Sequence, residues 1–206
     1  MNELAQELPE WVIGATTLGM VCSNGVVLAS EKKLSLGSLI ISKTVKKVFK
    51  ITENIGAACA GLSSDFQTLV RTIQAYANLY SLEAKKPIST RAAAKLMSTI
   101  LFSRKWLPLI TETIVAGVDS AGPQLYTLDL VGSLIEDDFA AVGTGAKVAI
   151  GVLESKYKRN ITLEEGKDLA LLAVKTASER DIASGEGVDI LTIGESGSSI
   201  LYVPLK

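Results

Sequence analysis

The sequence predicts an α+β protein, a four-layer α/β/β/α sandwich in which two mainly antiparallel sheets lie between two helix pairs. Three observations indicate this class. Apolar runs of strand length occur in groups, turn signals join the runs within a group, and stretches of helical periodicity separate the groups. The resulting order is strands, helix pair, strands, helix pair, strands. A single sheet with helices on one side would give a similar pattern, so periodicity alone does not exclude it.

The first group of strands begins with a hairpin. Residues 16–23 and 26–30 are apolar runs on either side of Asn24-Gly25, a dipeptide that strongly favours a tight hairpin turn. Connections of this kind lead to antiparallel pairing. Further short runs predict strands over 39–42, 46–51 and 55–61.

A helix pair is expected next. Over 64–82 the apolar side chains recur at helical spacing. They are Phe66, Leu69, Val70, Ile73 and Ala77. After Pro87, Ser89 can cap a second helix, because a serine hydroxyl accepts a hydrogen bond from a free N–H of the first turn.

The second half of the chain repeats this order. Strands are predicted over 113–119, 124–130 and 134–142. A helix should open at Gly143-Thr144-Gly145 and run to about Tyr157.

The last helix and hairpin complete the predicted sandwich. Thr162 and Glu165 form a T-x-x-E capping box for a helix that reaches about Arg180. A closing hairpin is predicted over 188–194 and 199–204. Since no linker-like stretch divides the chain, one domain is expected.

Composition excludes several classes of function. The 206 residues carry a net charge of −1, so the basic surface that nucleic acids require is missing. No apolar run approaches the roughly 18 residues that span a bilayer, and Glu3 and Glu7 oppose a secretory signal. We therefore expect a cytoplasmic protein that binds neither nucleic acid nor membrane. Cys22 and Cys59 lie among small and apolar residues, which favours buried free thiols over a disulfide.

The chain contains no histidine, and this restricts the possible chemistry. Ser-His-Asp and Cys-His mechanisms are excluded. A His-ligated zinc site is excluded too, and two cysteines cannot form a Cys-only one, so we expect neither metal nor cofactor. A hydrolase of this composition would need a lysine, a carboxylate or a free α-amine as its base.

Several segments together resemble a known family. They are Gly14-Ala15-Thr16-Thr17-Leu18-Gly19, Asn24-Gly25-Val26-Val27-Leu28-Ala29, Ser42-Lys43 with Lys46-Lys47-Val48, Ala60-Gly61, Gly143-Thr144-Gly145, and Glu179-Arg180-Asp181-Ile182-Ala183-Ser184-Gly185. In this order and spacing they resemble the β-type subunits of proteasome core particles, most closely the archaeal ones. The resemblance covers nearly the whole chain, and the extra first helix of the α-type subunits has no counterpart here.

The resemblance implies a fold, an activity and partners. The fold is that of N-terminal-nucleophile hydrolases, the four-layer sandwich expected above. The activity is threonine-type hydrolysis of unfolded polypeptides. The implied partners are proteasome α subunits and other β subunits in stacked heptameric rings, with a regulatory ATPase acting through the α ring.

The family's first segment is a glycine followed by three threonines. The chain is cut after the glycine, and the first threonine becomes both N-terminus and nucleophile. Its free α-amine, with an ordinary pKa of about 7.7–8.0, can act as base, and a nearby lysine cation lowers that pKa.

At the nucleophile position this chain has Ala15, after Gly14 at the cleavage site. Alanine has no hydroxyl, so neither catalysis nor self-cleavage is expected, and residues 1–14 should remain as a leader before a domain over 15–206. Thr16 should face the opposite side of the strand. Thr17 should face the same side but lie roughly 6–7 Å further along.

The resemblance also assigns the remaining catalytic positions. Lys47 would tune the amine and the hydroxyl, and Asp181 and Ser184 would orient the nucleophile. From position alone, Lys47 is equally a solvated strand lysine. Asp181 and Ser184 are equally a turn after a helix that ends at Gly185.

Two further positions depart from the active pattern. Glu31 stands where the family has an aspartate paired with the lysine, and its extra methylene should move the carboxylate by ~1 Å, a shift that can cost about 100-fold in rate. Thr144 replaces a serine near the nucleophile; from the residues alone, it is as well explained as a helix N-cap.

By the same resemblance, an apolar substrate pocket narrowed by a phenylalanine is expected; the alternative is that its residues simply belong to the core. The predicted pocket residues are Leu34, Val45, Phe49, Cys59 and Gly61.

Two hypotheses about activity remain open. In the first, the chain is a naturally non-catalytic β subunit that builds the ring, which the three departures Ala15, Glu31 and Thr144 favour. In the second, it is an active threonine endopeptidase subunit with an engineered change of threonine to alanine at position 15, which the otherwise intact first segment favours. A different N-terminal-nucleophile amidohydrolase is a third reading, against which Lys46-Lys47 and residues 180–185 argue.

Overall fold

Twelve strands and four helices are formed by the part of the chain that the computed structural model describes, residues 14–195 and 197–205. The strands before the first helix are β1 (Thr17–Cys22), β2 (Gly25–Glu31), β3 (Leu34–Leu36), β4 (Leu39–Ser42), β5 (Val48–Lys50) and β6 (Ile55–Gly61). The first helix pair is α1 (Ser63–Ala84) and α2 (Thr90–Ser103). Then come β7 (Thr111–Asp119), β8 (Gly122–Leu128), β9 (Leu134–Glu136), β10 (Phe139–Val142), α3 (Ala146–Lys156), α4 (Leu163–Ser178), β11 (Gly187–Gly194) and β12 (Gly197–Pro204).

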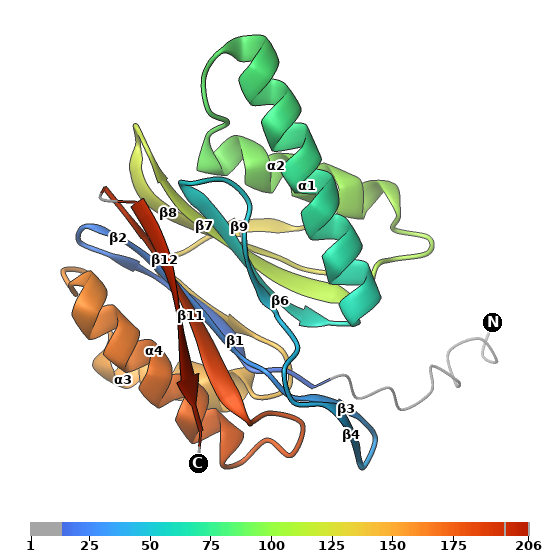
Figure 1. Ribbon diagram of the computed structural model, residues 1–206, viewed down its shortest axis with the longest axis vertical. Helices are drawn as coiled ribbons and strands as arrows, with labels where there is room; N and C mark the ends of the chain where they lie inside the picture. The colour runs from blue at the N-terminus through green and yellow to red at the C-terminus, as the bar shows by residue number, and fades with distance from the viewer. Residues whose placement is uncertain (1–13, 196, 206) are drawn as a thin grey trace.

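The strands form two five-stranded sheets. The first sheet has the order β10-β1-β2-β11-β12 and the second the order β5-β6-β7-β8-β9, while β3 and β4 form a separate two-stranded ribbon. Every strand pair among the described residues is antiparallel. Figure 1 shows α1 and α2 covering the outer face of the second sheet and α3 and α4 covering the first. The predicted four-layer sandwich is confirmed, and the single-sheet alternative is excluded.

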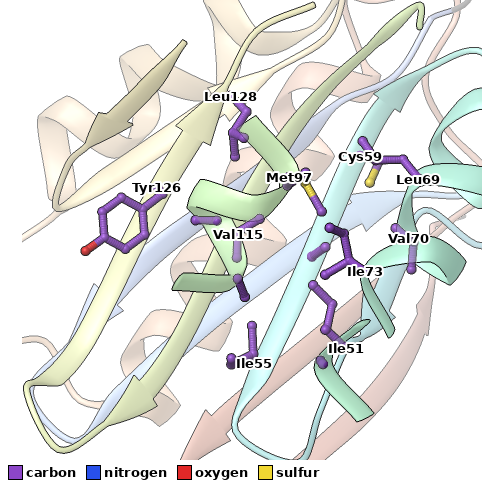
Figure 2. Packing of buried hydrophobic residues seen from close by; sticks show 14 of the residues in the cluster. Ile51, Ile55, Cys59, Leu69, Val70, Ile73, Met97, Val115, Tyr126 and Leu128 are labelled. Carbon is purple, nitrogen blue, oxygen red and sulfur yellow. The ribbon is translucent and has the colours of Figure 1, made fainter. Parts of the chain in front are cut away.

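Three apolar clusters fill the spaces between these layers. One lies between the sheets and includes Leu28, Ile114 and Leu191. A second lies between the first sheet and its helices. The third lies between the second sheet and α1 and α2, and Figure 2 shows its side chains. The layered architecture thus buries most of the apolar faces that the periodicity of the sequence predicts, while edge strand β12 stays largely exposed.

The predicted helix caps are present. The Ser89 hydroxyl accepts a hydrogen bond from the N–H of Ala92, and Thr162 and Glu165 form the reciprocal capping box at the start of α4. Cys22 and Cys59 are buried free thiols, as expected. Among the described residues, no helix combines the length and the apolar character needed to cross a membrane.

The structure corrects the prediction in several places. The first hairpin turns at Ser23-Asn24 and not at Asn24-Gly25, because Gly25 already pairs with Cys22. The run over 134–142 is two strands, because β9 pairs with β8 in the second sheet while β10 pairs with β1 in the first. The chain therefore passes from one sheet to the other within a single predicted strand. The short strand β3, which pairs with β4, was not predicted at all.

Candidate functional site

The residues predicted to be catalytic meet where several elements end on one side of the sandwich. Position 15 lies two residues before β1, Glu31 ends β2, and Lys47 directly precedes β5. Thr144 lies in the turn before α3. Asp181 and Ser184 lie in the connection between α4 and β11.

Lys47 and Glu31 form an ion pair in the interior. Their side chains are 2% and 0% exposed. The Lys47 Nζ also donates to the carbonyl of Lys33 at 2.7 Å and contacts the carbonyl of Gly14 at 3.5 Å. The position-only reading of Lys47 as a solvated strand lysine is therefore wrong.

Glu31 binds more than its lysine partner. While Oε1 contacts Lys47, Oε2 accepts hydrogen bonds from the N–H of Lys33 at 2.6 Å and the N–H of Gly185 at 3.1 Å. Burial raises the pKa of Glu31 and lowers the pKa of Lys47, because each loses hydration, and the attraction between the two charges opposes both shifts. Glu31 thus contacts Lys47 and also binds the turn after α4.

Thr144 contacts the backbone of Ala15. Its Oγ1 accepts a hydrogen bond from the Ala15 N–H at 3.3 Å and donates to Asp181 Oδ2 at 2.5 Å. The Ala15 carbonyl accepts from the N–H of Gly145 at 3.2 Å. The N-cap of α3 is Gly145 and has no side-chain cap, so the interpretation of Thr144 as an N-cap is wrong.

Asp181 also receives the Ser184 hydroxyl. Ser184 Oγ donates to Asp181 Oδ2 at 2.6 Å. Because the Ser184 proton is used in this bond, Thr16 Oγ1 is the donor in its 2.8 Å contact with Ser184 Oγ. Asp181 and Ser184 lie in a turn that follows the end of α4 at Ser178. They are therefore turn residues after a helix and, at the same time, neighbours of the other predicted catalytic residues. The contact of Thr16 with Ser184 was missed, although strand alternation already placed Thr16 opposite Ala15.

The predicted pocket residues lie in two environments. Cys59 is fully buried in the cluster between the second sheet and its helices (Figure 2). Val45 and Phe49 are half-buried and pack against the same cluster. Leu34 is half-buried on β3, and Gly61, at the end of β6, has a φ of +119°. Three of the five thus have the core contacts that the alternative reading expected. Their role as a pocket stays a prediction.

Comparison of the sequence with known proteins shows the family of this chain. The family model described as "Proteasome subunit" matches residues 12–193. The chain belongs to the proteasome subunit family. Its relatives include Proteasome subunit beta 2 of Caldivirga maquilingensis, which is 50% identical over 182 residues, 88% of this chain and 91% of that protein. Proteasome subunit beta 1 of Nitrosopumilus maritimus is 47% identical over 94% of this chain and 97% of its own length. The resemblance to archaeal proteasome β subunits is confirmed.

Proposed function

We propose that this chain is a β subunit of a proteasome core particle that contributes structure to the ring and does not itself cut peptides. The observation that carries the proposal is the side chain at position 15, a methyl group at the point where the other predicted catalytic residues converge. A methyl group cannot attack a carbonyl, and the step that would form an acyl-enzyme has no nucleophile.

The neighbouring hydroxyls do not replace the missing one. Thr144 and Ser184 both donate to Asp181, and Thr16 bonds to Ser184. The nitrogen of Ala15 is an amide in the intact chain and bonds to Thr144, so it is not the free amine that the family mechanism uses as base. Because cleavage after Gly14 would need the absent hydroxyl, we expect residues 1–14 to remain as a leader before a domain over 15–206. Of that leader, only Gly14 lies within the described residues.

Family membership implies assembly into a multi-subunit proteasome. We propose stacked heptameric rings in the cytoplasm, with α subunits and sister β subunits as partners, unfolded polypeptides as substrates of the particle, and a regulatory ATPase acting through the α ring. Large exposed apolar side chains on α1 and just after α2 support burial of this surface in an assembly. They include Leu79, Leu82, Trp106 and Leu107.

A second candidate is an active threonine endopeptidase subunit with an engineered alanine at position 15. The contact between Glu31 and Lys47 favours it, because the longer carboxylate still reaches the lysine. Restoring the hydroxyl would then suffice for activity.

Ala15→Thr, assayed in a core particle with no other active β subunit, separates the two candidates. If the subunit is naturally silent, Ala15→Thr alone should give little peptide hydrolysis. Adding Glu31→Asp or Thr144→Ser to Ala15→Thr should then raise the rate. Full hydrolysis and leader removal from Ala15→Thr alone would favour the engineered candidate. If the triple variant is inactive, the assignment of the catalytic positions is wrong.

A further inference from the structure

The polar groups around position 15 contact backbone groups on both sides of the bond between Gly14 and Ala15. The carbonyl of Gly14 lies 3.5 Å from Lys47 Nζ, the N–H of Ala15 donates to Thr144, and the carbonyl of Ala15 accepts from Gly145. A buried backbone group without a partner costs about as much as a lost hydrogen bond. A chain cut before Ala15 would have no Gly14 carbonyl for Lys47 to bind.

Gly14 is also required by packing. A Cβ at this position would lie 1.8 Å from the Cβ of Ala183 and 3.1 Å from Thr144 Oγ1. Any side chain here would push the backbone away from the turn that carries Asp181. The fit accounts for a glycine at this position without any cleavage step.

The same residues link the two sheets. Glu31 belongs to β2 of the first sheet, while Lys47 leads into β5 of the second, where its carbonyl accepts the N–H of Cys59 at 2.9 Å. Beside this pair, the Thr17 hydroxyl of the first sheet lies 3.1 Å from the carbonyl of Cys59 in the second.

We propose that Gly14, Glu31, Lys47 and Thr144 form a latch that holds the uncut segment 14–16 and ties the two sheets together at this end of the sandwich. The latch depends on the proposed function in one respect, namely that the bond between residues 14 and 15 stays intact. Because the ion pair is buried, it is sensitive to the loss of either member, since removing one leaves an uncompensated charge in the interior.

Lys47→Met in the full-length chain tests the latch by urea unfolding. We expect the ratio of folded to unfolded protein to fall about a hundredfold or more, because Glu31 would remain buried without its partner. The matched control is Lys50→Met, which removes an exposed ion pair with Glu53 close by in sequence and should change the ratio less than about fivefold. Equal effects of the two variants would overturn the proposal.

A double variant keeps the test decisive if Lys47→Met does not fold. Adding Glu31→Gln removes the second charge, so Lys47→Met/Glu31→Gln should recover most of the lost stability. If it is no more stable than Lys47→Met, the pair is not coupled and the latch is excluded.

Hydrogen exchange tests the hold on the uncut segment. Under native conditions, the amides of residues 14–18 should exchange at least about tenfold faster in Thr144→Val and Gly14→Ala than in the unaltered chain. Thr144→Val removes the acceptor of the Ala15 N–H, and Gly14→Ala introduces a Cβ that clashes with Ala183 and displaces the segment. Unchanged exchange there would overturn the latch. These readouts involve no peptidase assay, whereas the proposed function fails only if the particle shows hydrolysis at this subunit or the leader is removed.

Discussion

The polar groups around position 15 bind one another and the backbone, while the alanine there offers them only a methyl group. Asp181 receives two hydroxyls, from Thr144 and Ser184, and Glu31 receives one ammonium and two backbone N–H groups. The family resemblance predicted which residues would meet near position 15. Their partners could not be predicted, because the links to Gly185 and between Thr16 and Ser184 depend on how the turn after α4 folds back onto the end of β2.

The two cysteines should be unreactive in the native chain. Burial raises the pKa of Cys22 and Cys59 to about 12, from an ordinary value of 9.0. At pH 8 we expect an alkylating reagent to leave both thiols unmodified over a time in which the denatured chain reacts fully, as measured by intact mass. Stoichiometric modification of the folded chain on that timescale would contradict the burial of these residues.

The same shifts predict how stability changes in alkaline solution. Below pH 9 the thiols are protonated in both the folded and the unfolded chain. As the pH rises from 9 towards 12, they ionise in the unfolded chain before they ionise in the folded chain, and this lowers the free energy of unfolding. Urea unfolding between pH 8 and 11 should therefore show a decreasing free energy of unfolding. The decrease should be smaller in Cys59→Ala than in the unaltered chain, and an equal decrease would count against the raised pKa of Cys59.

At the scale of elements, α4 depends on its capping box. Thr162→Ala should lower the free energy of unfolding by about 1 kcal/mol, because the N–H of Glu165 loses its acceptor at the helix start. Thr176→Ala, on the same helix and away from its N-terminus, should change it by less than about 0.5 kcal/mol. Chemical denaturation of both variants measures the difference, and equal effects would show that the cap is not important.

The elements also show what sequence patterns can predict. The caps at Ser89 and Thr162 were placed correctly, since each is a local arrangement of backbone and side chain. The first hairpin was predicted too, but its turn lies at Ser23-Asn24, one residue before the predicted Asn24-Gly25, because Gly25 pairs with Cys22. The passage of 134–142 between sheets was not predicted, because alternation identifies a buried face without saying which sheet it completes. β3 is only three residues long, too short to give a periodic signal.

At the scale of the whole molecule, the leader should be retained. When this chain is assembled with α and β partners, its intact mass should correspond to the full 206 residues, because the hydroxyl needed to cut after Gly14 is absent. A mass that begins at residue 15 would mean that cleavage proceeds without that hydroxyl or is carried out by another subunit.

Assembly itself is the second prediction at this scale. Co-expressed with α subunits, the chain should enter a large cylinder detectable by native mass spectrometry, because exposed apolar side chains such as Trp106 and Leu107 become buried. Alone, it should show no peptidase activity. Recovery of nothing but free monomer from the co-expression would contradict the assignment of this chain to a ring.

The centre of the first sheet joins distant parts of the chain, since β2 pairs with β11 and so brings Val26 beside Ile193. A ribosome that has made the first 180 residues has produced all the strands of the second sheet but only β10, β1 and β2 of the first. Until the last strands emerge, the open edge of β2 presents unpaired backbone groups, which can pair with other chains. Pairings so distant in sequence also form slowly. During synthesis, we therefore expect this edge of the nascent subunit to be open to pairing with other chains.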